Sequence, residues 1–275
     1  MSDQPDLTVD GESDKWIIFD RQTDAGYPLV VFSRANNPCV DKSLHESLIT
    51  IVECQADISL VNDKQMPLHT DRLYDVEDGL ARELAALGVG ALHLGSVTGD
   101  GLRRIVFGHS SPVHLEPVLE LFNVEGYSLC AKQIHDRKPI IKLLIPTDIE
   151  VQLQGDMDII STLEKHGDDC QTVRKTDFWF YGPRASLEAL SNKLEPLGYS
   201  IDHWLDDPLG VVFSKETAVD IASFKEITPA LVGMAQQHGV DYDGWETFVS
   251  LPDAGKPTLT KPKSLLSRLF GSKEN

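Results

Sequence analysis

The sequence predicts an α+β protein made of two ferredoxin-like βαββαβ sandwiches in tandem, each an antiparallel sheet with its helices on one face. The first observation behind this prediction is that the expected order β-α-β-β-α-β occurs twice along the chain. The second is the length of 275 residues, which is enough for two domains that each bury a core. No repeat of residues accompanies the repeated order, so the predicted duplication is one of topology.

The first series of elements follows an opening hairpin around the turn signal Asp24-Ala25-Gly26. Its clearest element is a helix that Thr70 caps and Gly88 ends. The apolar residues of this helix recur at spacings of three and four and therefore share one face: Leu73, Val76, Leu80, Leu84 and Leu87. The expected ranges are 15–20 and 27–33 for the hairpin, 48–54, 91–97, 102–107 and 126–132 for strands, about 112–122 for a short helix, and 136–146 for a final strand with the domain connection.

The second series begins beyond a domain boundary that we place near Thr147. Pro183 favours the start of a helix after the first strand. The next helix is capped by Ser223, with Glu226 three residues on, or restarts at Thr228-Pro229. The expected ranges are 158–166 for an introductory helix, 172–181, 199–205 and 210–214 for strands, and a last strand that begins at Trp245.

The end of this second series has the most specific local pattern. Gly239 favours the stop of a helix, since a positive φ is cheapest for glycine. Asp243-Gly244 is a turn dipeptide, and Trp245 and Phe248 need a sheet or a helix to cover them. We expect a turn with acidic side chains beside a packed tryptophan.

Charge and composition restrict the class of protein. The chain is 41% hydrophobic and 25% charged, and its formal net charge is −18. Such a charge repels nucleic acid and favours a basic protein partner. No apolar run approaches the ~20 residues of a membrane helix, and the acidic first residues lack the pattern of a secretory signal. Four widely spaced cysteines without a C-x-x-C pair are typical of a reducing compartment, so we expect a cytoplasmic protein.

Motifs of catalysis, of metal binding and of cofactor binding were not found in the sequence. His109 and His114 lie near Glu116, but no H-E-x-x-H run accompanies them, and no phosphate loop or dinucleotide fingerprint occurs. Cys39 and Cys170 are nucleophiles only if a base lies beside them. We therefore expect no catalytic residue, no metal and no cofactor.

The run Phe178-Trp179-Phe180-Tyr181 invites comparison with RNA-recognition domains, which stack bases on exposed aromatic rings. The strand 210–215 lacks the basic and aromatic consensus of such domains, and about half of the aromatic rings must face the core. We expect no direct binding of nucleic acid.

The end of the chain has the opposite sign of charge. This segment contains five basic residues, and its only acidic residues are Asp253 and Glu274. Within it, residues 265–270 form a small apolar stripe at helical spacing. This segment is a partner motif, a weak membrane-surface contact or a frayed end.

The C-terminal half resembles the bacterial regulator of ribonuclease E activity B family. The residues that carry the resemblance are Val240 to Trp245 with the preceding helix 231–238, and upstream 155–161, 176–181 and 197–201. The resemblance implies a regulator that binds the basic, non-catalytic region of ribonuclease E and lowers its cleavage of RNA. The chain departs from the family in having a full domain in front and a basic tail behind, where usual members are single domains with acidic tails.

The N-terminal half resembles the bacterial domain-of-unknown-function family 695 over roughly residues 15–135. Trp16, Gly26-Tyr27-Pro28, 77–80, Leu94-Gly95 and Thr98 to Arg103 carry this resemblance. It implies a fold and no activity.

These observations predict a non-catalytic, cytoplasmic binding protein with a protein partner, ribonuclease E or a basic region of another protein. The alternative is a small-molecule-binding protein or an enzyme with its site between the two halves. We expect a tail at 1–14, domains at 15–147 and 148–250, and a basic tail at 251–275. The candidate partner-binding residues are Asp241, Tyr242, Asp243, Trp245, Asp206, Asp207, Asp168 and Asp169, and further acids of the same kind are Asp156, Asp158 and Asp202.

Overall fold

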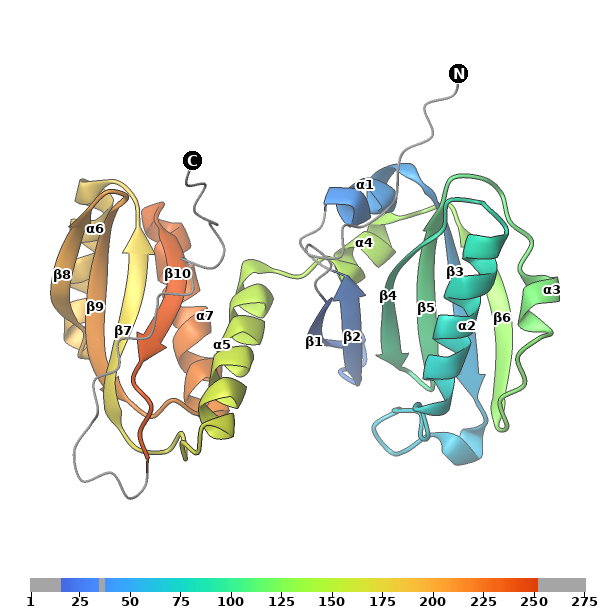
Figure 1. Cartoon of the computed structure of the whole chain (residues 1–275), viewed down its shortest axis with the longest axis horizontal. Helices are drawn as coiled ribbons and strands as arrows, with labels where there is room; N and C mark the ends of the chain where they lie inside the picture. Colours follow the sequence, from blue (N-terminus) through green and yellow to red (C-terminus); the bar gives the residue numbers. More distant parts are fainter. Residues whose placement is uncertain (1–15, 35–37, 252–275) are drawn as a thin grey trace, which may run out of the picture. The chain divides into compact units, whose positions relative to one another are not determined.

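The computed structural model describes residues 16–34 and 38–251 of the chain. The chain divides into two compact units, Met1–Thr147 and Asp148–Asn275, which we call the N-terminal unit and the C-terminal unit. Each unit contains one antiparallel sheet with helices packed against it, so the predicted fold class is confirmed (Figure 1). The predicted tails at 1–14 and 252–275 lie outside the described residues.

The described elements of the N-terminal unit are, in chain order, β1 (Trp16–Gln22), β2 (Pro28–Arg34), α1 (Pro38–Glu46), β3 (Leu48–Ala56), the 3-10 helix η1 (Ile58–Leu60), α2 (Arg72–Ala86), β4 (Leu92–Gly99), β5 (Leu102–His109), α3 (Glu116–Leu119), β6 (Tyr127–Ile134) and α4 (Lys138–Leu144). The strands form one sheet in the order β1-β2-β4-β5-β3-β6. Strand β3 lies between β5 and β6, which is the arrangement expected of a ferredoxin-like series that runs from β3 to β6. The hairpin β1-β2 extends this sheet beyond β4.

Helix α2 covers one face of the N-terminal sheet with the predicted apolar stripe. Leu73, Val76, Leu80 and Leu84 are buried, and they pack with residues of β3, β5 and α3 in one cluster. Leu87 was predicted on the same stripe but is 52% exposed, because the helix ends one residue before it. Helix α3 is shorter than the predicted range 112–122.

Two helices that the sequence analysis did not predict, α1 and α4, pack on the opposite face. Ser43 of α1 lies against Gly108 of β5, whose neighbour Phe107 faces α2. The strand predicted within 136–146 is wrong, because residues 138–144 are helical and Pro139 lies in the first turn, where its missing N–H is not needed. The sequence predicted helices on one face of this sheet, and α2 and α3 occupy that face. Helices α1 and α4 also cover the other face.

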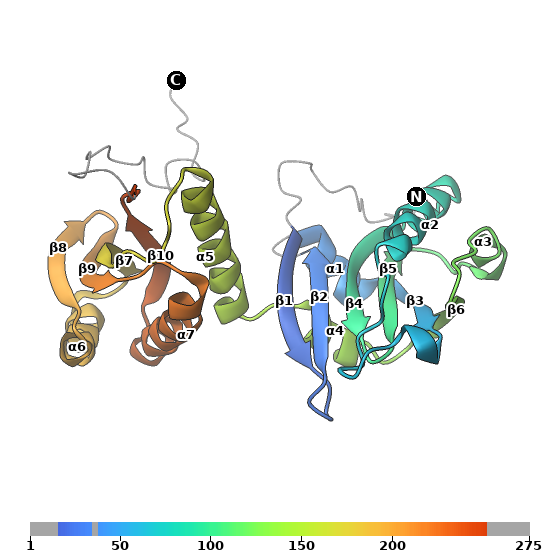
Figure 2. The same ribbon diagram turned by 90° about the horizontal axis from the view of Figure 1, so that it is seen from below.

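The described elements of the C-terminal unit are α5 (Asp148–Lys165), β7 (Arg174–Tyr181), α6 (Arg184–Leu194), the 3-10 helix η2 (Glu195–Leu197), β8 (Ser200–Asp206), β9 (Leu209–Thr217), α7 (Ile221–His238) and β10 (Asp241–Thr247). The sheet order is β10-β7-β9-β8, which again is that of a ferredoxin-like series. Figure 2 shows α6 and α7 on the same side of this sheet.

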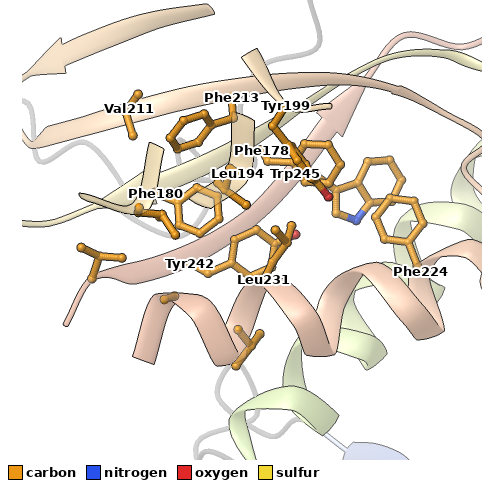
Figure 3. Packing of buried hydrophobic residues seen from close by; sticks show 14 of the residues in the cluster. Phe178, Phe180, Leu194, Tyr199, Val211, Phe213, Phe224, Leu231, Tyr242 and Trp245 are labelled. Atoms are coloured by element: carbon orange, nitrogen blue, oxygen red, sulfur yellow. The ribbon is translucent and has the colours of Figure 1, made fainter. Parts of the chain in front are cut away.

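The core of the C-terminal unit is aromatic and lies between the sheet and its helices (Figure 3). Trp245 stacks on Phe224 with ring centroids 4.2 Å apart, and Phe180 packs against Tyr242 at 5.0 Å. These rings come from β7, α7 and β10, so their packing joins distant parts of the sequence.

Helix α5 begins ten residues earlier than the predicted range 158–166. The early part of the helix contains polar residues that interrupt the apolar pattern, and two of these have partners inside the unit. Gln152 donates a hydrogen bond from Nε2 to the carbonyl of Tyr242 at 3.1 Å. Asp156 is buried and accepts hydrogen bonds from Trp245 Nε1 at 2.7 Å and from Thr228 Oγ1 at 2.5 Å. The helix thus packs through polar contacts that hydrophobic periodicity cannot reveal.

Helix α7 is continuous through Pro229, so the predicted restart at Thr228-Pro229 does not occur. Its N-cap is Asp220, whose carboxylate accepts the backbone N–H of Ser223 at 2.8 Å. The predicted stop at Gly239 is confirmed, with φ of 63° in the left-handed region.

Strand β10 begins at Asp241 and not at Trp245. Its register with β7 shifts between Tyr242 and Trp245, so Asp243 and Gly244 form a β-bulge within the strand and not a turn before it. Gly244 has φ of 97°, which few other residues tolerate. Because of the extra residue, Tyr242 and Trp245 both face the core although they are three positions apart.

Candidate protein-binding face

The second face of the C-terminal sheet is formed by side chains that alternate with the core residues. Along β7, Phe178 and Phe180 are buried beneath α6 and α7, while Trp179 and Tyr181 point the other way and are partly exposed. The side chains of this second face come from all four strands. They combine aromatic rings with carboxylates.

The aromatic part of the face is centred on Trp179. Its ring meets the ring of His203 of β8 edge-on, with centroids 6.0 Å apart. Val212 of β9 lies between them in the strand register and is fully buried. Tyr181 follows two residues further along β7, so apolar ring surface continues along this strand.

The acidic part of the face begins with a pair of carboxylates held in place by hydrogen bonds. Ser214 Oγ donates to Asp177 Oδ1 at 2.5 Å. Lys175 Nζ donates to Asp202 Oδ1 at 2.7 Å and lies 3.3 Å from Asp177. His203 Nδ1 lies 2.8 Å from Asp202. The hydrogen bond from Lys175 and then the one with His203 hold the pKa of Asp202 below its usual value, so this carboxylate stays charged.

Strand β10 adds three further carboxyl groups. Glu246 lies opposite Asp177 in the register, and Asp241 lies opposite Tyr181. Burial and then the charge of Asp177 raise the pKa of Glu246. Burial and then Asp241 raise the pKa of Asp243. Burial is the main cause of both raised pKa values, and the neighbouring acids add to it, so a cation bound among these groups would favour their charged forms.

We call this surface the acidic aromatic face. Lys175 lies among its residues at one end of β7. Guanidinium and ammonium groups match both parts of the face, since they pair with carboxylates and stack on aromatic rings. Phosphate groups do not match it. The face is defined by Asp177, Trp179, Tyr181, Asp202, His203, Asp241, Asp243 and Glu246.

The structure distributes the predicted partner-binding residues over three places. Asp241 and Asp243 belong to the acidic aromatic face. Asp206, Asp207 and Asp169 are exposed but lie outside it; Asp206 is the last residue of β8, and Asp207 lies in the turn between β8 and β9. They stay predictions as partner contacts.

The other three predicted residues are buried. Tyr242 and Trp245 are buried in the aromatic core. Asp168 is buried and paired with Arg174 Nη1 at 3.0 Å, and it accepts the backbone N–H groups of Cys170 and Ser250. Their side chains are buried, and their role as partner contacts stays a prediction.

Five residues of the face were not predicted from the sequence as partner contacts: Asp177, Trp179, Tyr181, His203 and Glu246. The sequence pattern that could have identified the β7 residues is the alternation of the strand, in which Phe178 and Phe180 face the core and the residues between them face the other way. Which acids of β8 and β10 join them depends on strand register, which no local pattern shows.

The other candidate chemical groups have structural partners. His109 is buried between Thr50 Oγ1 at 2.8 Å and the carbonyl of Ser111 at 2.7 Å. Burial raises the pKa of the Cys54 thiol to about 12 and also raises the pKa of Cys170. Among residues 16–34 and 38–251, no group of three His, Cys, Asp or Glu side chains is placed to hold a metal ion. In the same part of the chain, no helix has the length and apolar character needed to cross a bilayer.

The fold and the face together define a ferredoxin-like α+β unit with a surface suited to cationic groups. The family model described as "Regulator of ribonuclease activity B" matches residues 154–247, from within α5 to the end of β10. The match covers about a third of the chain and nearly all of the described C-terminal unit, which is therefore similar to that family. The resemblance of the N-terminal half to the domain-of-unknown-function family 695 stays a prediction.

No curated protein matches the chain. A solved structure described as an unknown protein from Galdieria sulphuraria is similar at 11% identity, over 72% of this chain and 96% of its own, with a TM-score of 0.21.

Proposed function

We propose that this protein is a non-catalytic regulator that binds a basic segment of a protein partner on the acidic aromatic face, and that the partner is ribonuclease E or an enzyme of its type. The observation that carries the proposal is the cluster of carboxylates around Trp179 and Tyr181 on a sheet face. The match of the same unit to a family of ribonuclease regulators supports the choice of partner.

The physical basis of binding is electrostatic attraction with aromatic stacking. An arginine over Trp179 gains a cation–π contact of roughly 0.5–2 kcal/mol. Its neighbours in a basic segment then meet Asp177, Asp202 or Glu246. The net charge of −18 attracts such a segment over a distance and repels RNA. Inhibition of RNA cleavage would then follow from occupation of the enzyme's basic region.

We expect that the paired substitution Asp177→Asn with Glu246→Gln weakens binding of an arginine-rich peptide from the non-catalytic region of ribonuclease E by about 10-fold at low salt. Both changes remove charge and keep shape, so the sheet is preserved. Isothermal titration calorimetry measures the affinity. The matched control is Asp78→Asn with Glu83→Gln, two exposed acids of α2. Equal weakening in both variants would mean that net charge matters and the face does not.

Binding should also depend strongly on ionic strength. The Debye length falls from about 10 Å at 0.1 M to about 3 Å at 1 M salt, so charges on an exposed face lose most of their attraction. We expect the affinity for the same peptide to fall steeply between these conditions. An affinity that does not change would rule out the electrostatic basis of the proposal.

The choice of ribonuclease E is tested separately by its activity. Full-length protein added to ribonuclease E should lower the rate of RNA cleavage, and the variant with Asp177→Asn and Glu246→Gln should do so less. If the peptide binds but cleavage is unaffected, the face is a binding surface for a different basic protein.

A further inference from the structure

We propose that the basic segment 256–273 of this chain binds to its own acidic aromatic face and competes there with the partner. This inference rests on the proposed function for the role of the face as a binding surface. The segment holds basic residues in a chain whose formal net charge is −18, and within 252–275 only Asp253 and Glu274 oppose them. The basic residues are Lys256, Lys261, Lys263, Arg268 and Lys273.

The described chain ends at the end of the sheet where β7 begins. Thr247 of β10 pairs with Thr176 of β7, at the same end of the sheet as Lys175. Three residues later, the backbone N–H of Ser250 donates to Asp168 Oδ2 at 2.7 Å. Leu251, the last described residue, packs against Gly167 in the loop that precedes β7. The segment therefore starts beside the first residues of β7.

The length of the segment is sufficient to cross the face. An extended chain spans at most roughly 3.3–3.6 Å per residue, so Lys261 lies within about 35 Å of Leu251. Strand β7 has 8 residues, which at ~3.3 Å per residue is about 27 Å. Lys261 and Lys263 can therefore reach carboxylates along the whole of β7, and Lys256 those in its first part.

The residue pattern of the segment suits a sheet face. Pro257 and Pro262 disfavour helix in the residues before them and favour an extended chain. In an extended chain side chains alternate, so Leu259, Lys261 and Lys263 share one side. This places one apolar and two cationic groups in a row, opposite a face in which aromatic rings are flanked by carboxylates.

The covalent connection makes weak contacts sufficient. A short covalent connection gives an effective concentration on the order of 1 mM, so a segment that would bind with a millimolar dissociation constant in isolation occupies the face about half of the time. A partner must displace it. The segment therefore lowers the apparent affinity of the face for a basic partner, and only a partner that binds more tightly than the segment displaces it.

Zero-length carbodiimide coupling of the full-length protein at low salt tests the contact, because it joins a lysine to a carboxylate that lies against it. We expect intramolecular products that join Lys261 or Lys263 to Asp177, Asp202 or Glu246, and their loss at 1 M salt. Coupling that is no more frequent at these acids than at Asp78 and Glu83 of α2 would overturn the proposal. Products found only between two molecules would overturn it as well, since the occupant would then be a second copy.

Competition is tested with a nonapeptide of arginine as the probe. A full-length variant with Lys261→Gln, Lys263→Gln and Arg268→Gln should bind the probe about 2–5-fold more tightly than the unchanged protein at low salt. The control with Lys261→Arg and Lys263→Arg keeps the charge and should not differ. Equal affinities for the neutralised and unchanged proteins would overturn the competition. Failure of the probe to bind either protein would overturn the proposed function of the face, while the coupling products would still decide whether the segment docks.

Discussion

Replacing Arg103 with methionine is expected to lower the free energy of unfolding of the N-terminal unit by about 3–5 kcal/mol, the usual cost of removing one partner of a buried ion pair. Arg103 donates from Nε and Nη2 to the buried Glu77 carboxylate at 3.0 and 2.7 Å, and from Nη1 to Thr98 Oγ1 at 2.6 Å. Ser96 and His93 also contact this carboxylate. Without the guanidinium, α2 would hold an uncompensated charge against β4 and β5.

Hydrogen exchange of β4 and β5 in the full-length protein, measured over a urea series, gives the free energy of unfolding of the N-terminal unit separately from that of the C-terminal unit. The double variant with Glu77→Gln and Arg103→Met is the control, because it buries no charge and should recover part of the loss. If the single variant is no less stable than the double variant, the pair does not stabilise the unit as described.

The same pair has a predicted dependence on pH. Burial raises the pKa of Glu77, but the hydrogen bond with His93 and the charge of Arg103 outweigh it, and the net effect lowers the pKa below 4.5. A carboxyl whose pKa is lower in the folded state contributes stability above its unfolded pKa and loses it as the pH falls. The N-terminal unit should therefore lose stability below about pH 4.5.

Replacing Asp156 with asparagine is expected to stabilise the C-terminal unit by up to about 3 kcal/mol above pH 6, since a shift of one pKa unit corresponds to about 1.4 kcal/mol. Burial raises the pKa of Asp156 from 3.8 to about 6, although its hydrogen bonds with Thr228 and Trp245 act in the opposite direction. The unit therefore takes up a proton on folding between these pH values. An asparagine at this position can keep a hydrogen bond to each partner without the charge.

The sign of this effect is opposite to that of Glu77. Because the folded pKa is raised, the stability of the unchanged C-terminal unit should fall as the pH rises from about 4 to about 6. Urea unfolding at several pH values, followed by hydrogen exchange of β10, should show this slope in the unchanged protein and a smaller slope in the Asp156→Asn variant. Equal slopes would show that Asp156 does not titrate in this range.

Several features of this protein were determined by the sequence alone. The two βαββαβ series, the stripe of α2 and the end of α7 at Gly239 were predicted from local patterns. Each depends on a period of 2 or 3.6 residues, or on the permitted φ of one glycine, and such signals lie within a few residues of one another. The predicted fold class followed from them.

Other elements required the tertiary structure. Helices α1 and α4 and the first part of α5 are short or polar, and packing on a sheet or hydrogen bonds such as those of Gln152 and Asp156 stabilise them. The bulge at Asp243 and Gly244 reversed the direction of the side chains that follow it. For this reason Trp245, predicted as a packed residue and also as a candidate partner contact, faces the core.

For the candidate site too, the sequence determined one part and the tertiary structure the other. The sequence predicted an acidic protein with a preference for a basic partner, because charge is a sum over residues. It did not predict which acids gather, because Asp177, Asp202 and Glu246 come from three strands that are distant in the chain. Their proximity depends on strand order and register, which are decided by the side chains that fill the aromatic core on the other face of the sheet.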